Sequence, residues 1–297
     1  MACICGCPVR LLRISPSSRE NGAPISRIIR YVGEREVKEM KDKHLIQIDP
    51  EKCVGCGLCK KDCPAGNIVV ENKKAKLLTQ DCILCGHCVA ICPKAAVSMT
   101  GFDEPPEEIV GPVTLDPQTL LAAIKTRRTI RQFTGREIAP EAIAQIIEAG
   151  RLTPTGKNAQ DVSFVVLKEG MDAAEALAVR LFRRLLPLMK LVSPMARRTA
   201  IDDHFFFKKA PAVIVAVSRD KVNGALAAAN MALMAEAWGL GVLYSGFFAM
   251  AVNYSHQLRR MLGIKGKQRA VTALVLGYPG VRYPRTAQKE AAVIRSV

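Results

Sequence analysis

The chain repeats one cysteine motif, and no other feature of the sequence restricts its fold as strongly. Each copy has the spacing C-x-x-C-x-x-C-x-x-x-C followed at once by proline, and the copies run from Cys53 to Pro64 and from Cys82 to Pro93. They hold eight of the eleven cysteines, whereas a disulfide-stabilised protein spreads its bridges over the whole fold. The clustering predicts a metal site in a reducing compartment, and we expect the cytoplasm.

The spacing of each copy suits an iron–sulfur cubane. Three cysteines with two residues between neighbours wrap one face of a [4Fe–4S] cluster in a tight loop, where Gly55, Gly57 and Gly86 relieve backbone crowding. The fourth cysteine begins a short helix that leaves this cluster and ligates the other one. We therefore predict two clusters, with the ligands Cys53, Cys56, Cys59 and Cys92 for the first and Cys82, Cys85, Cys88 and Cys63 for the second.

Structural zinc is the alternative metal for these cysteines. A zinc ion needs only two C-x-x-C pairs, and it gives no reason for a Cys-Pro at the same offset twice. The segment from Lys43 to Gly101 resembles the two-cluster bacterial ferredoxins. This resemblance implies that the module transfers electrons one at a time and that a second redox centre lies nearby, in another protein or in the rest of the chain.

Composition changes along the chain and predicts its division into domains. Residues 1–39 are Arg-rich without periodicity, and we expect either a disordered extension or a start site placed too early, with Met40 as the true start. We assign no role to the three cysteines near the N-terminus. The other zones are a two-cluster ferredoxin-type domain at 40–103, an acidic, proline-containing linker at 104–114 and a larger α+β domain at 115–294.

The larger domain begins with a helix signal and a basic segment. Asp116 and Pro117 suit the N-cap and first position of a helix whose apolar residues lie on one face. Arg127, Arg128 and Arg131 surround Thr129, a donor-rich patch suited to phosphate; a solvated basic helix end is the alternative. A helix at 140–152, a strand at 163–167 and a late strand ending at 277–279 follow.

The order of these pieces, with Gly239-Leu240-Gly241 and Tyr244-Ser245-Gly246-Phe247 between the strands, resembles the FMN-dependent nitroreductase family over about 115–294. The resemblance implies an α+β sandwich, an obligate homodimer and one FMN at each of two subunit interfaces. It also implies the FMN-binding residues: Arg127, Arg128, Thr129 and Arg131 at the phosphate and ribityl chain, Asn158 beside the ring with Thr155 and Gln160, Ser245 and Gly246 near the reactive edge, and Arg282 and Arg285 at the phosphate.

Two segments of the larger domain differ from, or vary within, the family pattern. The family often has Gln-Pro-Trp after the asparagine, but here Asp161-Val162 follows Gln160, which changes the ring-stacking surface. The segment Met171–Lys209 corresponds to a variable insertion. We interpret it as a packed helical hairpin with solvated arginines, and a lid that binds substrate over the flavin is the alternative. His204 receives no role.

The net charge and one long apolar stretch raise the question of whether nucleic acid or a membrane is a partner. The formal net charge is +16, but residues 1–39 contribute +3 of it, and two oxidised cubanes with one flavin phosphate would remove about six charges. With few aromatic residues and no nucleic-acid-binding motif, we predict no nucleic-acid partner. The apolar stretch 225–252 is interrupted by glycines, so we predict a core helix, a turn and a strand and no membrane partner.

These features predict an oxidoreductase in which the chemistry takes place at FMN N5 and no side chain is the catalytic group. Its acceptor would be a small molecule such as a nitroaromatic, quinone or similar electrophile. NAD(P)H is a candidate donor, although no G-x-G-x-x-G follows a strand. The alternatives are a reductive dehalogenase or flavin-dependent oxidase on the same fold, and an electron-transfer or redox-sensing flavoprotein with a redox partner such as ferredoxin and no dedicated small substrate.

Overall fold

The computed structural model describes residues 11–14, 29–32, 44–102 and 105–297. The chain divides into two compact units. The first contains Met1–Pro112 and the loop Pro154–Asp161, and the second contains Val113–Thr153 and Val162–Val297. The second unit therefore begins within the linker expected from the sequence, but one loop between its own elements belongs by its contacts to the first unit.

The cysteine-rich module has two short antiparallel strand pairs and two short helices. Strand β3 (Ile46–Ile48) pairs with β6 (Val97–Met99), and β4 (Ile68–Glu71) pairs with β5 (Lys74–Leu77). Helices α2 (Leu58–Asp62) and α3 (His87–Ala90) occupy equivalent places in the two copies of the motif. Both end before the fourth cysteine of their copy, so the prediction that this cysteine begins a helix was wrong. Each follows a glycine in the left-handed region, Gly57 at φ 77° and Gly86 at φ 76°, a conformation that favours glycine.

Two strands precede this module, β1 (Leu11–Ile14) and β2 (Ile29–Val32), which pair antiparallel. The rest of residues 1–39, including Cys3, Cys5 and Cys7, lies outside the described residues. The prediction of a disordered extension or a misplaced start therefore stays a prediction.

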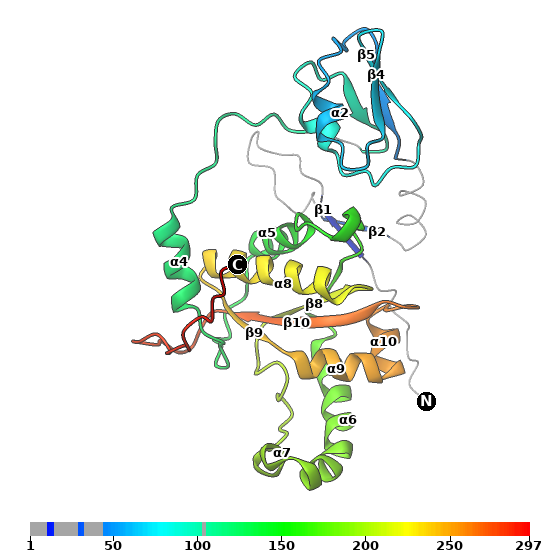
Figure 1. Cartoon of the computed structure of the whole chain (residues 1–297). Coiled ribbons are helices and arrows are strands. Elements are labelled where there is room, and N and C mark those ends of the chain that lie inside the picture. The colour runs from blue at the N-terminus through cyan, green and yellow to red at the C-terminus, as the bar shows by residue number, and fades with distance from the viewer. Residues whose placement is uncertain (1–10, 15–28, 33–43, 103–104) are drawn as a thin grey trace. The chain divides into compact units, whose positions relative to one another are not determined.

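The second unit is a sheet covered by helices on both faces (Figure 1). The strand order is β7-β8-β10-β9, and every neighbouring pair is antiparallel. Helix α5 (Pro140–Arg151) and helix α8 (Lys221–Ala237) cover one face, and α6 (Met171–Val192), α9 (Gly246–Tyr254) and α10 (His256–Met261) lie on the other. The strands are β7 (Ser163–Leu167), β8 (Ala212–Ser218), β9 (Gly241–Tyr244) and β10 (Arg269–Gly277).

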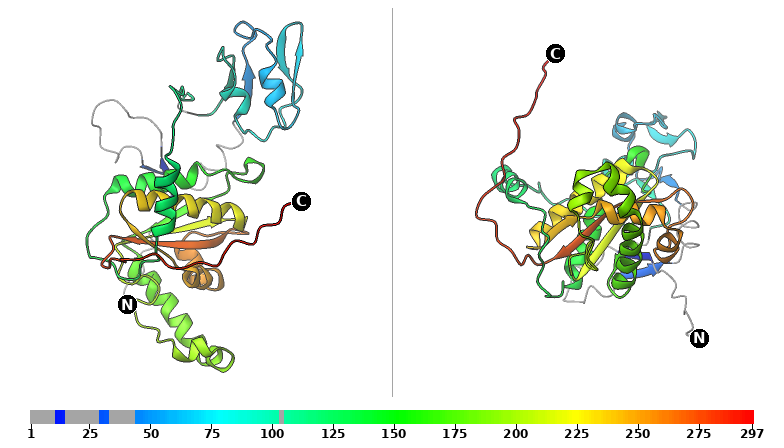
Figure 2. Two further views of the ribbon diagram at one scale, coloured as in Figure 1. Left: turned by 60° about the vertical axis from the view of Figure 1, so that its left-hand side comes forward. Right: turned by 90° about the horizontal axis from the view of Figure 1, so that it is seen from below.

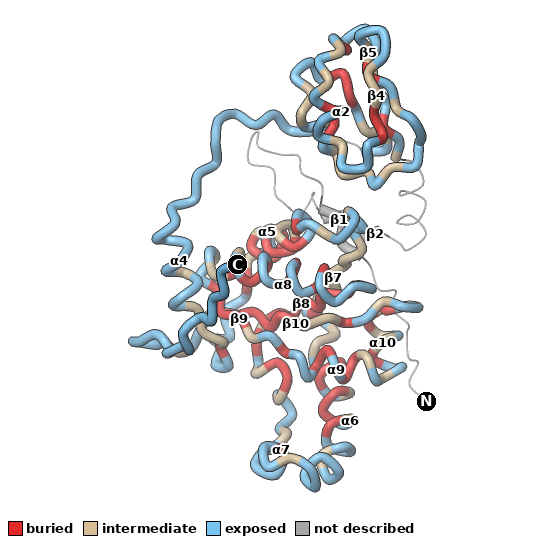
Figure 3. Tube along the Cα trace, viewed as in Figure 1, coloured by how far each residue is buried: buried red, intermediate tan, exposed pale blue. Residues whose placement is uncertain are grey.

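The core of this unit lies along the central strands. All seven residues of β8 are buried, and the central strands are mostly buried in Figure 3. Phe206, Phe207 and Phe248 of α9 are buried in the same core cluster as residues of β8. A strand with both faces buried reads as a continuous apolar run rather than an alternating one. The predicted α+β fold is confirmed, and so are the helix near 140–152 and the strand at 163–167.

The apolar stretch 225–252 contains the predicted helix and strand, as most of α8 and strand β9, but it continues into most of a second helix, α9, which was not predicted. Among the described residues, no helix combines the length and the apolar character needed to cross a membrane.

Helix α4 (Pro117–Thr126) forms where the sequence predicted it. Its N-cap Asp116 accepts a hydrogen bond of 2.8 Å from the Thr119 backbone N–H. No residue of this helix is buried in the single chain, and its apolar Leu121 and Ile124 are 58% and 51% exposed. The helix therefore presents an uncovered apolar face.

Candidate iron–sulfur and flavin sites

The eight cysteines line two cavities of the first unit, four to each. Cys53, Cys56, Cys59 and Cys92 line one cavity, and Cys63, Cys82, Cys85 and Cys88 line the other. Counting space open to solvent, the volumes are about 360 and 370 Å³. Each cavity thus combines three cysteines of one copy with the fourth cysteine of the other, which is the crossed arrangement expected from the spacing.

Backbone N–H groups point at the cysteine sulfurs in a pattern that follows the repeat. Asn67 N–H donates to Cys63 Sγ at 3.4 Å, and Ala96 N–H donates to Cys92 Sγ at 3.3 Å. In both bonds the donor lies four residues after the cysteine in the chain. Ala75 N–H donates to Cys53 Sγ at 3.3 Å and Leu84 N–H to Cys82 Sγ at 3.4 Å. Such bonds stabilise thiolates and tune the reduction potential of a cluster that they hold. The donor set therefore fits a cubane in each cavity.

Burial acts against free thiolates at these sites. It raises the pKa of the Cys88 thiol to about 11, and it raises the pKa of Cys59, in both cases against the lowering effect of a backbone N–H. Burial therefore favours the protonated form of these two thiols, and coordination of a metal would release their protons. Among the described residues, no three His, Cys, Asp or Glu side chains are arranged to hold a single metal ion; the cysteines surround larger spaces.

The predicted flavin-side residue Asn158 lies in the loop that belongs to the first unit. Its side-chain amide donates to the backbone carbonyls of Ile83 at 3.1 Å and Leu84 at 2.8 Å, between two cysteines of the second cavity. Three non-glycine residues of this loop have positive φ: Lys157 at 53°, Asn158 at 51° and Gln160 at 45°. Backbone strain of this kind persists only where the surroundings impose it, and it clusters at functional sites.

The other two predicted residues of this loop contact each other. Thr155 Oγ1 accepts a hydrogen bond of 2.9 Å from Gln160 N–H, and the Thr155 carbonyl accepts one of 2.9 Å from Asn158 N–H. The loop is therefore held by its own bonds, and its predicted contact with a flavin ring stays a prediction. The contact with Ile83 and Leu84 was not foreseen from the sequence, because no local pattern pairs residues that lie 74 and 75 positions apart.

In the second unit, the basic segment from Arg127 to Phe133 lies against the sheet. Ile130 N–H donates to the Val242 carbonyl of β9 at 3.2 Å, and Thr129 forms a parallel bridge with Val242. The close approach depends on glycine, because a Cβ at Gly241 would lie 2.4 Å from Ile130 Cγ1 and one at Gly277 would lie 2.8 Å from Phe133 Cδ1. Tertiary packing therefore positions this segment beside β9.

Arg127 is the member of the predicted phosphate set that best fits an anion. Its Nη1 is buried and, among the described residues, has no hydrogen-bond partner. Burial raises the pKa of Tyr244 and of Glu236, and the positive charge of Arg127 partly opposes this shift in both. A buried guanidinium nitrogen without a partner is costly, so this position fits an anionic group such as a phosphate. The sequence carried no signal for Tyr244 or Glu236 as neighbours of Arg127.

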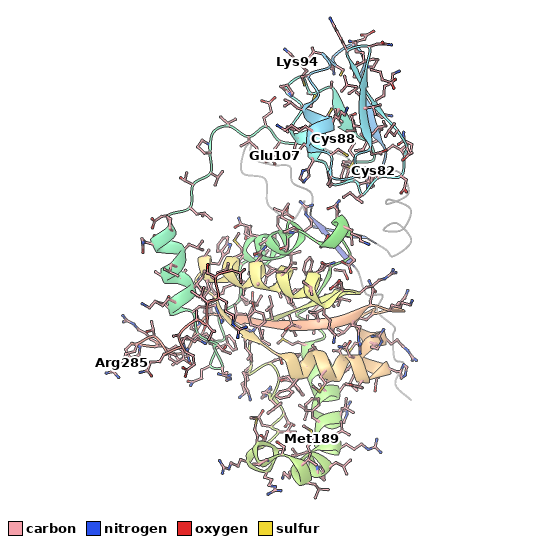
Figure 4. The ribbon with its side chains drawn as sticks, viewed as in Figure 1. Cys82, Cys88, Lys94, Glu107, Met189 and Arg285 are labelled. Carbon is pink, nitrogen blue, oxygen red and sulfur yellow. The ribbon has the colours of Figure 1, made fainter. Side chains whose placement is uncertain are left out.

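The remaining predicted flavin residues are placed in different ways. Arg128 lies over the ring of Tyr283, 5.9 Å from its centroid, on the segment that also carries Arg282 and Arg285. Arg131, Arg282 and Arg285 are exposed, and Arg285 is labelled in Figure 4. Ser245 is buried and its N–H donates to the Ala273 carbonyl at 2.7 Å; Gly246 then begins α9. The structure thus brings Arg128 to the C-terminal basic segment and leaves the flavin roles of these residues as predictions.

The insertion Met171–Lys209 contains a buried carboxylate, Glu175, that was not foreseen from the sequence. Glu175 of α6 is only 3% exposed, and its Oε1 accepts hydrogen bonds from Phe206 N–H at 2.9 Å and Phe207 N–H at 2.7 Å. His204 Nδ1 lies 3.6 Å from the other carboxylate oxygen. Burial raises the pKa of Glu175 and outweighs the lowering by the Phe207 and Phe206 N–H groups and by His204. Its position on the apolar stripe with Ala178 and Phe182 was the signal that could have indicated it.

The rest of the insertion is a helical projection. Helix α6 extends away from the sheet and is followed by the short helix α7 (Pro194–Arg198), as two views show (Figures 1 and 2). Arg183 pairs with Asp203 at 2.9 Å, whereas Arg184 and Arg198 are exposed. The structure agrees with a helical element that is packed at its base and carries solvated arginines.

Comparison with known proteins supports both parts of the chain. Residues 45–93 and 1–67 match two models described as a 4Fe-4S dicluster domain. Over 47 residues the chain is 47% identical to a component of the ion-translocating oxidoreductase complex of Methanosarcina acetivorans, and the match covers 16% of this chain and 18% of that protein. The chain thus spans less than a fifth of that relative.

The second unit resembles solved structures. A nitroreductase with bound FMN from Bacteroides fragilis has a TM-score of 0.50 at 19% identity, covering 60% of this chain and 98% of that one. An FMN-dependent nitroreductase from Clostridium difficile has a TM-score of 0.50 at 16% identity, covering 61% and 100%. At these identities the likeness shows the fold. The model of the nitroreductase family matches residues 124–278, more than half of the chain, and the chain therefore belongs to the nitroreductase family, with a 4Fe–4S dicluster module preceding its nitroreductase domain.

Proposed function

We propose that this protein passes electrons between two [4Fe–4S] clusters and FMN, and that it reduces a nitroaromatic, a quinone or a similar electrophile. The observation that carries the proposal is the combination of two four-cysteine cavities with a buried, unpartnered Arg127 nitrogen in a nitroreductase domain. One set of residues suits one-electron centres, and the other suits the phosphate of a two-electron cofactor.

The protein's part in this chemistry is to bind, orient and tune. When bound, the clusters supply single electrons and the flavin supplies two-electron chemistry at N5. The N–H groups of Asn67, Ala75, Leu84 and Ala96 stabilise cysteine thiolates. Arg127 would hold the phosphate, and water screens the charge of its guanidinium less because Nη1 is buried. No side chain is required as a nucleophile or general base.

The apolar face of α4 supports the homodimer that the family resemblance implied. Leu120, Leu121 and Ile124 are 38%, 58% and 51% exposed in the single chain. Large apolar side chains grouped on one helix face favour burial against a partner. A second copy of the chain is the partner we propose, so that α4 is covered only in the dimer.

The test is anaerobic purification followed by measurement of iron, sulfide, flavin and mass in solution. We expect about eight irons and one FMN per chain, from two cubanes and one flavin site, in a dimer. Reductive titration with NADH, NADPH and reduced ferredoxin in turn then identifies the donor. Protein with zinc in place of iron would overturn the proposal.

Turnover separates the reduction of a small molecule from electron carriage. We expect the reduced protein to be reoxidised by nitroaromatic or quinone acceptors in steady state. Reoxidation by a partner ferredoxin with no response to organic acceptors would instead show a carrier. Halide release from a halogenated aromatic would show a dehalogenase.

A further inference from the structure

The end of the insertion is an exposed apolar surface. We call residues 183–200 the tip; they comprise the last part of α6, the turn after it and α7. Leu188, Leu191, Val192 and Met195 are 64%, 73%, 84% and 74% exposed, and Leu185 and Met189 are also exposed. Figure 3 shows the chain around α7 as mostly exposed, and Figure 4 labels Met189. Contiguous exposed apolar side chains of this size mark an interaction surface.

The same surface is strongly basic. The tip contains five Arg or Lys residues and no Asp or Glu. Arg183 at the base pairs with Asp203, but Arg184, Lys190 and Arg198 have no acidic partner among the described residues. Three exposed cations thus lie among the exposed leucine, valine and methionine side chains.

The tip has a defined shape. Arg197 donates from Nε to the Lys190 carbonyl at 2.8 Å and from Nη2 to the Leu191 carbonyl at 3.3 Å, which satisfies carbonyls at the end of α6. Ser193 Oγ accepts from Ala196 N–H at 3.3 Å and begins α7. The turn therefore holds Leu191, Val192 and Met195 in place on the outside.

We propose that the tip docks on the surface of an anionic lipid bilayer, with its apolar side chains in the interface and its cations on the lipid headgroups. Apolar burial and attraction to anionic lipid together drive such shallow binding. A second copy docked tip to tip is a poorer match, because each tip carries five Arg or Lys residues and no Asp or Glu and like charges repel. A nucleic acid would match the cations but would leave the aliphatic side chains exposed.

This docking differs from a membrane span, for which no described helix qualifies. It needs only the surface of a bilayer. The docking does not depend on the proposed function, but one consequence rests on it: among the proposed acceptors, a lipid-soluble quinone is the class that a docked protein would meet.

The test is co-sedimentation of the full anaerobically purified protein with vesicles. We expect binding to vesicles of phosphatidylcholine with 30–40% phosphatidylglycerol (about the range in which an anionic surface potential is strong) and little binding to pure phosphatidylcholine. The triple variant R184E/K190E/R198E should bind on the order of a hundredfold more weakly, since each of the three cations near such a surface contributes on the order of fivefold. The variant L188S/L191S/V192S should also lose binding, because the apolar part of the interaction is removed.

A matched control is K168E/K221E/K267E, which makes the same change of charge at exposed lysines outside the tip. We expect it to keep vesicle binding, and all variants to keep the iron content and circular dichroism of the wild type. No binding of the wild type to anionic vesicles would overturn the proposal, as would an equal loss in the control. If the tip variants dissociate a dimer and the wild type ignores vesicles, a second copy covers the tip. These outcomes concern binding alone, so failure here leaves the proposed electron transfer untouched.

Discussion

Asn158 donates a hydrogen bond of 3.1 Å to the carbonyl of Ile83, and the N–H of the same peptide, which belongs to Leu84, donates to Cys82 Sγ at 3.4 Å. A second bond of 2.8 Å joins the Asn158 amide to the Leu84 carbonyl. The side chain thus polarises a peptide whose N–H faces a predicted cluster ligand, and hydrogen bonds in such a chain reinforce one another. All of these residues belong to the first unit.

Asn158→Ala should lower the reduction potential of the second cluster, because hydrogen bonds to cluster sulfurs favour the reduced form. Loss of a whole bond of about 0.5–1.5 kcal/mol would correspond to about 20–60 mV for one electron, and the Leu84 N–H bond to sulfur is weakened but kept, so we expect a shift below that range. Redox titration followed by electron paramagnetic resonance measures this shift. Gln160→Ala is the control from the same loop, and an unshifted potential in N158A with lost FMN would place Asn158 at the flavin alone.

The crossed ligand sets predict which pairs of cysteines act together. The double variant C56A/C92A removes two ligands of one predicted cluster, so we expect the other cluster to remain with about four irons. The variant C56A/C63A removes one ligand from each predicted cluster and should damage both. Iron and sulfide analysis with electron paramagnetic resonance distinguishes them. The reverse result, with one intact cluster only in C56A/C63A, would show that each copy of the motif binds its own cluster.

Arg127→Ala should weaken FMN binding about tenfold to a hundredfold, the effect of losing a charged hydrogen bond of about 1.5–3 kcal/mol. Riboflavin lacks the phosphate, so its affinity should change far less. Titration of flavin-free protein with each compound, followed by fluorescence, gives the two dissociation constants. Arg136→Ala is the control, since that exposed guanidinium lies over the Tyr278 ring at 4.2 Å. Equal losses for FMN and riboflavin would place Arg127 away from the phosphate.

Glu175→Ala should destabilise the second unit by at least about 2 kcal/mol, because two buried N–H groups lose their acceptor. Asp172→Ala removes an exposed carboxylate from the same helix and should change the free energy of unfolding by less than about 0.5 kcal/mol. Denaturant unfolding followed by circular dichroism compares them. Similar values for the two variants would show that Glu175 does not hold the Phe206–Phe207 turn.

The same residue predicts a pH dependence. Burial raises the pKa of Glu175 in the folded state, so the folded protein binds more protons than the unfolded chain between the two pKa values. Its contribution to stability is full below the ordinary glutamate pKa and is lost as the pH rises through the raised pKa. Glu175→Gln should lack this loss, and unfolding curves measured from pH 4 upward should show the difference. If the free energies of unfolding of the wild type and of Glu175→Gln changed with pH in parallel, this prediction would be contradicted.

The sequence alone determined the features that depend on local spacing. The cysteine repeat predicted two crossed ligand sets, because a cubane imposes fixed intervals between its ligands, and the same two sets line the two cavities. Helix α4 starts at its Asp116 cap, and strand β7 has the predicted bounds, because capping chemistry and short apolar runs act within a few residues. The order of such pieces was enough to indicate the family and its fold.

Tertiary structure alone decided the contacts between distant residues. Three such contacts join segments far apart in the chain. Asn158 donates to the carbonyls of Ile83 and Leu84, Arg127 lies near Tyr244, and Glu175 accepts from the backbone of Phe206. The exposure of the α4 face and of the tip also followed only from the packed structure. The physical reason is that burial and hydrogen-bond partners depend on which elements meet, and no periodicity within one element records its partner.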